Sequence, residues 1–460
     1  MLTTTKGTST WTQKWKCILL LTFIFIANAT IYWLTSFPIK ALKIPGPQQA
    51  RWLTATPQPQ PQKACGFPVQ RGPLIGVSGS KSFVVTPYVE HRGTVKEIRI
   101  ISIIYRPEPQ NYHCLLCCGG RNFSVTATSK VHTDHFGFDF CTGDIFCPVL
   151  SGCDTPEHVT IFSNAMSVGV AGWEPTFIPV LNQEPKSSGF DFSFTVCIST
   201  LFGNYSNTLQ VVESMEMYRL LGVQRVVVYK NSCSPEVQKV LDYYVSEGLV
   251  EVVPWHVSSF ISVSSGWKKS VSSGDLHYYG QIPALNDCVY RYMYRTEYIA
   301  LHDIDELILP LKAENWHQLL RQLEQEHSPG MGFEFENFVF PISVSDEGSK
   351  YRPKEWGDIQ GVNILEHVYR LPNIPGEFNN FKVIINPRSV FEATVHGFLD
   401  SKYGSVRVSP QEAHMYHIKE AHRPYLQQKE LIKDDRIRHY SSRLLPAVSE
   451  VLKNALEKAQ

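Results

Sequence analysis

The chain has 460 residues, of which 43% are hydrophobic and 12% aromatic, enough to bury one large core or two medium ones. Its 43 Lys and Arg residues balance its 43 Asp and Glu residues. The global charge therefore gives no reason to expect a nucleic-acid partner, and we predict none.

The amino terminus predicts a membrane anchor. After Lys14 and Lys16 the chain carries no charge from 17 to 37, and at about 1.5 Å per residue this run spans a bilayer core. The sequence "ANA" at 27–29 leaves a cleaved signal peptide as the alternative. The following "TIYWLTSF" prolongs the apolar run and ends in aromatic residues, which favours the anchor. We expect a cytosolic tail at 1–16, one transmembrane helix at 17–37, and a luminal remainder.

Residues 38–73 are rich in Pro and Gln, with "TPQPQPQK" at their centre. Such a composition favours the extended polyproline conformation and cannot bury a core. We interpret this segment as a stem between the anchor and the folded domains.

The cysteines predict disulfide bonds. All but one of the 11 cysteines follow the uncharged run, which leaves an even number and allows complete pairing in an oxidising lumen. Zinc is the alternative for "CLLCC" at 114–118 and "CTGDIFC" at 141–147, with His132 and His135 nearby. The two adjacent cysteines of the first motif suit crowded disulfides at least as well, so we favour disulfides.

Residues 75–190 are predicted to form a β-rich domain that contains disulfides. The segments "VKEIRIISIIYR", "NFSVTATSKVH" and "HVTIFS" are rich in β-branched residues and lie between Gly and Pro clusters, as in a β-sandwich. Glycosylation sequons at Asn122 and Asn204 agree with a luminal location. We identify no catalytic constellation in this domain.

The pattern changes at residue 191. The strand "FSFTVCIST", a helix that ends at Gly222 and the strand "VQRVVVYKN" come first. Ser234 and Pro235 then start a second helix before the strand "LVEVVPW", and the helix "ALNDCVYRYMYRT" precedes the strand "EYIALHDI". This β-α-β-α-β-α-β order predicts an α/β domain at 191–430, with a largely parallel, Rossmann-like sheet that binds ligands at its carboxyl edge. Residues 431–460 are expected to form a C-terminal helical tail.

Three carboxylates, Asp303, Asp305 and Glu306, follow the last of these strands. In an extended chain Asp303 and Asp305 project to the same side. No Lys or Arg lies within several residues, and two hard oxygen ligands suit Mn²⁺ or Mg²⁺ bridging to a diphosphate. We therefore predict that a metal offsets the repulsion, with a solvated turn or a helix cap as the alternative.

From "CIST" at Cys197, through "LLGVQRVVVYKNS", to "ALHDIDELILP", the sequence resembles glycosyltransferase family 92. The resemblance continues through "FKVIINPRSVFEATVHGF" and "AHMYHIKEAH". It implies a GT-A fold and a single-pass type II membrane enzyme of the Golgi. It also implies a UDP-sugar donor, UDP-galactose, a glycan acceptor on glycoprotein or glycolipid, and inversion to a β-linkage. His302 before the first Asp and "HIKE" near the end depart from the family pattern.

The reaction assigns a role to each group. A divalent cation held by Asp303 and Asp305 acts as a Lewis acid on the leaving diphosphate. The attacking acceptor hydroxyl needs a carboxylate base opposite the metal. We predict Glu336 as this base, although the alternating "FEFENF" also suits a solvent-facing edge strand. The other candidates downstream are Glu334, Asp346 and Glu347.

The resemblance also implies a late histidine as third metal ligand. His396 in "VHGF" is the first choice and His417 the second, with His414 also available. Each of them is alternatively an ordinary surface or core histidine. Lys382 and Arg388 are predicted to neutralise the donor diphosphate, with solvated strand charges as the alternative.

The predicted function is a metal-dependent inverting galactosyltransferase. A catalytically silent relative that binds glycans or a partner enzyme is one alternative, and the intact Asp303-x-Asp305 argues against it. A secreted, disulfide-rich binding protein is another, and it rests on cleavage at "ANA". Neither the acceptor, the linkage position nor the oligomeric state is predicted.

Overall fold

The computed structural model describes residues 63–163, 174–346, 350–374, 376–421 and 427–456. The predicted cytosolic tail and transmembrane helix lie outside these residues, as does most of the predicted stem. No helix in the described ranges is both long and apolar enough to cross a bilayer.

The described part begins inside the segment that the sequence assigns to the stem. Strands β1 (Lys63–Ala64) and β2 (Phe67–Pro68) pair as a hairpin. Cys65, between them, is bonded to Cys117 of the β-rich domain. Residues 63–68 are therefore part of a folded unit rather than of a polyproline-like stem, because strand pairing and a covalent bond fix them.

Two antiparallel sheets form the β-rich domain. Side chains from both sheets, including Ile100 and Leu116, share one hydrophobic core, as in a sandwich. The five-stranded sheet has the order β3 (Ile75–Gly76), β4 (Phe83–Glu90), β5 (Glu97–Tyr105), β9 (Phe140–Pro148), β8 (Thr128–Val131). The four-stranded sheet has the order β11 (Ile178–Pro179), β10 (His158–Ser163), β6 (Tyr112–Cys118), β7 (Arg121–Thr126).

The preference for disulfides over zinc is confirmed, but the complete pairing that an even number of cysteines allows is not found among the described residues. Cys141 is buried and free, and Cys233 is half-buried and free. Alternation along β6 turns Cys114 and Cys118 into the sandwich core and Cys117 to the opposite face, so they reach different partners. The bonds are Cys65–Cys117, Cys114–Cys147, Cys118–Cys153 and Cys197–Cys288.

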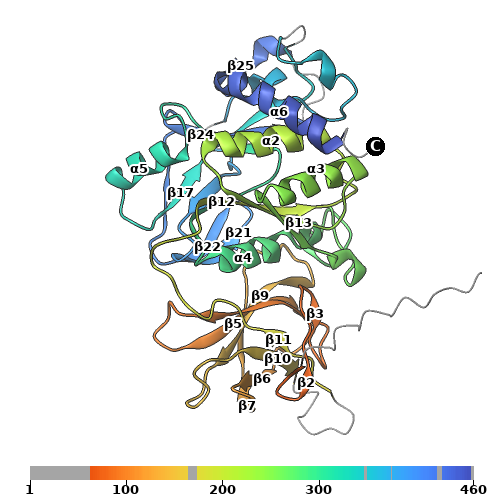
Figure 1. Ribbon diagram of the computed structural model, residues 1–460, viewed down its shortest axis with the longest axis vertical. Helices are drawn as coiled ribbons and strands as arrows, with labels where there is room; N and C mark the ends of the chain where they lie inside the picture. The colour runs from red at the N-terminus through yellow and green to blue at the C-terminus, as the bar shows by residue number, and fades with distance from the viewer. Residues whose placement is uncertain (1–62, 164–173, 347–349, 375, 422–426, 457–460) are drawn as a thin grey trace, which may run out of the picture. The chain divides into compact units, whose positions relative to one another are not determined.

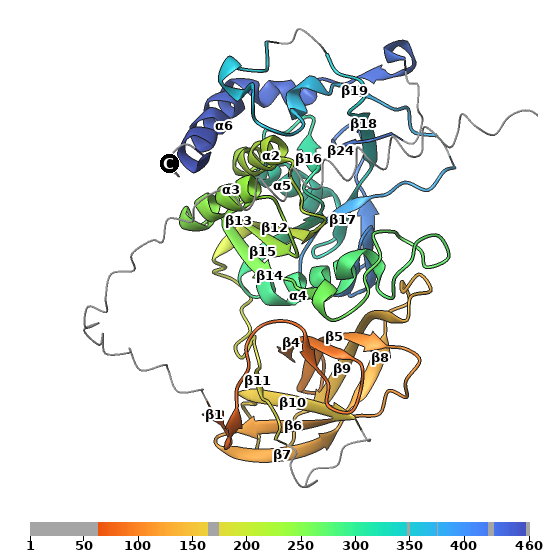
Figure 2. The same ribbon diagram turned by 90° about the vertical axis from the view of Figure 1, so that its right-hand side faces the viewer.

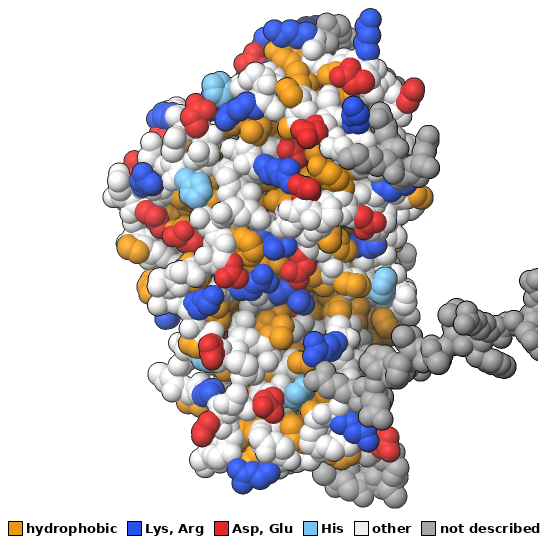
Figure 3. All heavy atoms as spheres, in the orientation of Figure 1, with side chains coloured by type: hydrophobic (Ala, Val, Ile, Leu, Met, Phe, Trp, Pro, Cys, Tyr) orange, Lys and Arg blue, Asp and Glu red, His pale blue; other side chains and the backbone are white. Residues whose placement is uncertain are grey.

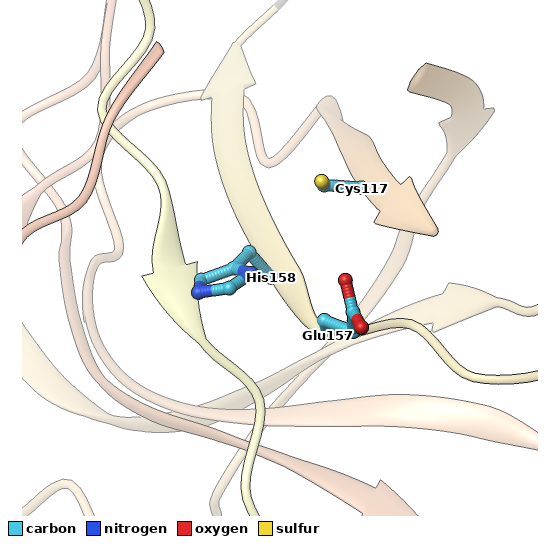
Figure 4. Close-up of side chains that lie close together, drawn as sticks. All are labelled: Cys117, Glu157 and His158. Carbon is cyan, nitrogen blue, oxygen red and sulfur yellow. The ribbon is translucent and has the colours of Figure 1, made fainter. Parts of the chain in front are cut away.

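One group near these cysteines has the composition of a metal site. Figure 4 shows the side chains of Cys117, Glu157 and His158, whose potential ligand atoms lie within 4.8 Å of one another. The sulfur of Cys117 is already bonded to Cys65, so it offers no thiolate. The group is therefore not a zinc site in the oxidised protein.

The predicted β-α-β-α-β-α-β order of the α/β domain is confirmed. Ser234 caps the second helix by accepting a hydrogen bond from the Val237 amide at 3.2 Å, and Gly222 ends the first helix with a φ of 97°. The elements are β12 (Phe192–Leu201), α2 (Thr208–Leu221), β13 (Arg225–Lys230), α3 (Pro235–Ser246), β14 (Val250–Pro254), α4 (Gln281–Tyr292) and β15 (Thr296–His302).

These strands lie in a seven-stranded sheet of order β14-β13-β12-β15-β20-β17-β23. The first four are mutually parallel, but β20 (Lys382–Ile385) runs antiparallel to both its neighbours, β15 and β17 (Gly332–Phe335), so the sheet is mixed. Strand β23 (Ser405–Arg407) forms the edge beyond β17. Helices α2 and α3 cover one face and α4 covers the other, as Figures 1 and 2 show.

A smaller sheet continues two strands of the large one. It has the order β16 (Glu306–Pro310), β24 (Ala413–Lys419), β18 (Asn337–Pro341). The chain passes from the large sheet into the smaller one three times, from β15 to β16, from β17 to β18 and from β23 to β24. The remaining elements are α5 (Trp316–Glu326), the hairpin β21 (Val390–Thr394) and β22 (Gly397–Ser401), and the pair β19 (Tyr369–Arg370) and β25 (Ile432–Lys433).

The last helix, α6 (Ser441–Leu456), lies in the region expected to form a C-terminal tail. It packs on α2 and α3 and buries Leu444 and Val448 completely in the large core. It is therefore part of the α/β domain. On the face seen in Figure 3, basic and acidic side chains are interspersed, as the balanced composition predicts.

Candidate functional site

The acidic turn 303–305 joins β15 to β16. Ile304 is 5% exposed and packs into the core, and its carbonyl accepts a hydrogen bond from Ser214 at 2.8 Å. The side chains of Asp303 and Asp305 are 34% and 31% exposed. Burial of the middle residue thus turns both carboxylates outward at the carboxyl edge of the large sheet, in agreement with the expected alternation.

Lys382 compensates the negative charge of this turn. Its ammonium lies 3.1 Å from Asp303 Oδ2 and 3.2 Å from Glu306 Oε2. The side chains of Lys382 and Glu306 are 3% and 1% exposed, so little water screens these pairs. Lys382 therefore offsets repulsion that the sequence assigned to a metal, because antiparallel β20 brings a lysine from far along the chain to the end of β15. A metal at this turn stays a prediction.

Two further donors hold Asp303. Its Oδ1 accepts hydrogen bonds from Ser199 Oγ at 2.8 Å and from Gln281 Nε2 at 2.9 Å. Ser199 lies near the end of β12, and Gln281 is the first residue of α4. The strand order reverses between β12 and β15, so these contacts lie at the switch point where α/β sheets bind ligands.

These contacts shift the pKa values of the charged groups. Burial opposes ionisation of Asp303, but Lys382 and the hydrogen bond from Ser199 outweigh it, and the pKa of Asp303 falls well below its usual range. Burial lowers the pKa of Lys382, but Asp303 and Glu306 raise it further, so the ammonium stays charged at neutral pH. Burial raises the pKa of Glu306.

Asp305 and His417 form the pair best suited to hold a cation. Asp305 Oδ2 lies 3.4 Å from His417 Nε2. Two ligand atoms about 2.1 Å from one ion lie roughly 3 to 3.5 Å apart, so this spacing fits a shared ion. On the other side of the imidazole, Glu306 Oε1 lies 3.4 Å from Nδ1 and orients the ring, as carboxylates commonly do behind a metal-bound histidine.

Asp303 and His396 suit direct metal ligation less well. The ammonium beside Asp303 repels a cation, and both oxygens already accept hydrogen bonds. His396 lies in the turn between β21 and β22, and burial, followed by the charge of Lys382, lowers its pKa to about 3. His414 is bound to Asp434 at 3.1 Å and stacks on Tyr416. Of the three histidines, the structure brings His417 to Asp305.

Arg388 lies at the other end of the sheet. Its guanidinium donates to the backbone carbonyls of Met293 and Thr296 at 2.8 Å and 2.6 Å, beside the start of β15. Because β20 runs antiparallel to β15, its first residue reaches the acidic turn and the residues after its end do not. Arg388 therefore holds the backbone there and is not part of the candidate site.

Among the candidate bases, Glu336 is the one whose neighbour in sequence contacts His417 of the Asp305–His417 pair. It sits at the crossover from β17 to β18, and the next residue, Asn337, has its Nδ2 3.2 Å from His417 Nδ1. Glu336 accepts a hydrogen bond from Asn373 at 2.6 Å. Asp346 and Glu334 have other partners, Arg438 at 2.7 Å and Ser405 at 2.5 Å. Glu347 lies outside the described residues.

A strained turn aims Gln281 at Asp303. Tyr278 and Tyr279 adopt φ values of 33° and 52°, in the left-handed region that bulky residues rarely enter, and Gly280 follows at 71°. Tyr279 stacks on Phe202 with ring centroids 4.3 Å apart. This ring packing stabilises the strained turn. The turn directly precedes α4, whose first residue, Gln281, contacts the acidic turn.

The sequence interpretation missed Ser199 and Gln281. Ser199 lies in "CIST", to which the resemblance assigned no role, and Gln281 belongs to no recognisable motif. They lie 104 and 22 positions from Asp303 in sequence. For Ser199 there was one available signal, its place near the end of the first strand of a predicted parallel sheet. For Gln281 no signal was available in the sequence, because α4 starts after Gly280 without a side-chain cap.

A second buried group with metal-binding composition lies where the β-rich domain meets the α/β domain. It comprises His132, Asp144 and Glu392. Arg99 donates to Asp144 at 2.5 Å and lies 3.9 Å from Glu392. A guanidinium already occupies the cation position, so we interpret this group as a structural ion network.

Comparison with known proteins gives one family. The model of "Glycosyltransferase family 92" matches residues 192–446. "Glycosyltransferase family 92 protein F13G3.3" of Caenorhabditis elegans is 24% identical over 53% of this chain and 44% of its own length. "Beta-1,4-galactosyltransferase galt-1" of the same organism is 22% identical over 50% of this chain and 49% of its own.

A plant relative matches a shorter stretch. "Galactan beta-1,4-galactosyltransferase GALS1" of Arabidopsis thaliana is 25% identical over 39% of this chain and 33% of its own length. The chain thus spans less than half the length of these three relatives. The family match covers β12 to α6 and leaves out the β-rich domain.

Proposed function

This chain belongs to glycosyltransferase family 92, and on that premise we propose that it transfers galactose from UDP-galactose to a glycan acceptor. The linkage formed is β, the reaction inverts the anomeric carbon, and it depends on Mn²⁺ or Mg²⁺. The fold we propose for the α/β domain is the GT-A type. Two relatives whose names state a β-1,4-galactosyltransferase support galactose as the transferred sugar and the β-linkage.

The observation that carries the proposal is the pair Asp305 and His417 beside the neutralised carboxylate Asp303. Asp305 Oδ2 and His417 Nε2 lie 3.4 Å apart, both partly reachable by solvent. They are the residues that would hold the metal. When bound there, a divalent ion supplies Lewis-acid stabilisation to a leaving diphosphate.

The other groups of the turn position this pair. Lys382 and Asp303 form a fixed ion pair that sets the backbone between β15 and β16. Ser199 and Gln281 prevent Asp303 from rotating, because both donate to the same oxygen. A rigid, charge-balanced turn holds Asp305 in one orientation, which lowers the reorganisation needed when donor binds.

Glu336 is the proposed base. The hydrogen bond from Asn373 to Glu336 Oε1 fixes the carboxylate but leaves the other oxygen to accept a proton. Its neighbour Asn337 contacts His417, so base and metal pair are linked through one strand crossover. For inversion, Glu336 removes the proton from the acceptor hydroxyl as that oxygen attacks the face opposite the leaving group.

We also propose that the enzyme is a single-pass type II protein of the Golgi membrane, with the catalytic domain in the lumen. Four disulfides suit an oxidising compartment. The sequon residues Asn122 and Asn204 are both exposed and so accessible to glycosylation. Protease protection of the carboxyl terminus in intact vesicles tests the topology, and recovery of most of the protein in the medium would contradict it.

The function is tested by binding and turnover together. Calorimetry should detect UDP binding in the presence of Mn²⁺ and little without it, and a donor screen should give turnover with UDP-galactose. Glu336→Gln should keep Mn²⁺-dependent UDP binding and lose at least about a hundredfold in turnover. UDP binding that ignores Mn²⁺ would contradict the metal role, and metal-dependent binding without turnover on any acceptor would favour the silent glycan-binding relative.

A further inference from the structure

Two stretches of the chain, 371–374 and 376–381, are tied to the crossover that carries Glu336. Asn373 Nδ2 donates to Glu336 Oε1 at 2.6 Å. Asn379 holds the backbone of Asn337 on both sides, accepting from its amide at 2.8 Å and donating to its carbonyl at 3.0 Å. Asn373 Nδ2 also lies 3.2 Å from the Asn337 carbonyl, so four hydrogen bonds hold Asn373 and Asn379 against Glu336 and Asn337, the residue that contacts His417.

Both stretches expose an apolar side chain to solvent. Phe378 is 79% exposed, the largest exposed fraction among the large hydrophobic side chains of the described residues, and Ile374 is 46% exposed. The Phe378 ring centroid lies 6.2 Å from that of His396, in the turn between β21 and β22. A single exposed hydrophobic residue needs no explanation by itself, so the informative feature is the place of Phe378 beside His396 and next to Asn379, which holds the crossover that carries Glu336.

Phe378 lies on the other side of the acidic turn from Ser199 and Gln281, where we expect the nucleotide of the donor. Ser199 and Gln281 approach Asp303 from β12 and α4, at the switch point. Lys382 and Glu336, with Asn373 and Asn379 bonded to the crossover after β17, approach from β20 and β17, on the opposite side of β15. A donor at the switch point would leave the Phe378 side for the second substrate.

We propose that Phe378 is the stacking platform for a neutral sugar ring of the acceptor glycan. This inference rests on the proposed function, because it places the acceptor beside Glu336. A pyranose ring has an apolar face of C–H groups, and a flat, solvent-exposed aromatic ring at the rim of a polar site binds such a face while polar neighbours bind the hydroxyls. Ile374 widens the apolar surface, and the side chain of Asn379 stays tied to the backbone.

The test measures glycan binding without donor. The wild-type chain is applied to an array of immobilised neutral oligosaccharides that end in galactose, N-acetylglucosamine or fucose. Phe378→Ala should weaken retention on the best-bound glycan about tenfold, and Phe378→Trp should retain it. Tyr403→Ala is the matched control, because Tyr403 is 53% exposed but lies beside Gly330, which precedes β17 at the end away from Glu336.

The readouts separate this inference from the proposed function. Phe378→Ala should leave the thermal unfolding midpoint and Mn²⁺-dependent UDP binding unchanged, and in turnover assays it should raise the acceptor KM with kcat for donor hydrolysis unaltered. Equal glycan retention by wild type and Phe378→Ala, or no retained glycan at all, would overturn the acceptor platform and leave the donor assignment standing. Glycan retention that depends on Phe378 without UDP binding would support the platform and reject the transferase.

Discussion

The ammonium of Lys382 lies 3.1 Å from Asp303 Oδ2, although 79 residues separate the two in sequence. The same nitrogen lies 3.2 Å from Glu306. The pairing makes the acidic turn stable without a metal, and it changes the roles of the two aspartates. Asp303 is an internal counterion of the fold, and Asp305 remains available to a ligand.

Replacing the lysine should therefore destabilise the protein. Lys382→Met leaves two carboxylates close together with no cation, and breaking a buried ion pair on one side costs about 3 to 5 kcal/mol. The free energy of unfolding from denaturant titration should fall by this amount. The double variant Lys382→Met with Glu306→Gln should recover part of the loss, because one of the unpaired charges is removed.

Lys433→Met is the control for this series. Lys433 pairs with Asp435 at 3.4 Å, but both side chains are more than half exposed, so its loss should change the free energy of unfolding by less than about 0.5 kcal/mol. If Lys382→Met were as stable as Lys433→Met, the ion pair at the acidic turn would not be a structural one.

The two aspartates should respond differently to the same substitution. Asp305→Asn removes the charge from the metal pair, so Mn²⁺-dependent UDP binding should disappear and turnover should fall at least about a hundredfold, equivalent to roughly 2.7 kcal/mol. The metal-free unfolding free energy should stay nearly constant. Asp303→Asn should lower that free energy, because the depressed pKa of Asp303 means that the fold stabilises its ionised form.

Calorimetry and denaturant titration on both variants separate these outcomes. His417→Gln should reproduce the binding defect of Asp305→Asn, whereas His396→Gln should keep metal-dependent UDP binding. An equal loss of binding in His396→Gln and no loss in His417→Gln would move the metal pair to the other histidine.

The sequence predicted the elements of the α/β domain well because the signals there are local. Ser234 with Pro235 marks a helix start and Gly222 a helix end, and both positions act through contacts within a few residues. The acidic cluster at 303–306 was found for the same reason. Its electrostatic partner was not, because only the antiparallel placement of β20 brings Lys382 there, and strand order is not encoded in any short pattern.

The same limit explains the treatment of the two aspartates as equivalent. In an extended chain they project alike, and both are indeed about one-third exposed. What separates them is the set of groups around each: a lysine, a serine and a glutamine around Asp303, and a histidine beside Asp305. These four groups come from four different elements, so the difference could be predicted only from the tertiary structure.

The free thiols should differ in reactivity. Cys141 is 3% exposed and burial raises its pKa to about 12, so its thiol is unreactive in the native state. Cys233 is half-buried and should react slowly with a maleimide at neutral pH. Peptide mapping without reductant should find label on Cys233 in the native protein and on both after unfolding. Label on any of the eight paired cysteines, or none on Cys141 after unfolding, would contradict the pairing.

His277 should make the stability of the protein depend on pH. Its side chain is 5% exposed, stacks on Phe136 at 4.8 Å, and has its pKa lowered by burial to about 4. In the unfolded chain a histidine has a pKa of about 6.5, so between these values the unfolded state binds the additional proton. The contribution of His277 is therefore fully present above about pH 6.5 and is lost as the pH falls to about 4.

Two variants test this sign. His277→Phe cannot be protonated and retains the stacking, and the Nδ1 that it removes has no hydrogen-bond partner among the described residues, so its free energy of unfolding should vary less between pH 6.5 and pH 4. Over this pH range the stability lost by wild type should exceed that lost by His277→Phe by as much as roughly 3 kcal/mol.

Asp134 lines the same small cavity as His277, and burial raises its pKa, so its protonation favours the folded state as the pH falls. In Asp134→Asn the free energy of unfolding should therefore fall more steeply with decreasing pH than in wild type, whereas in His277→Phe it should fall less steeply. Denaturant titrations of wild type and both variants at half-unit pH steps would measure these slopes, and parallel profiles for wild type and His277→Phe would mean that His277 is already neutral or equally protonated in both states.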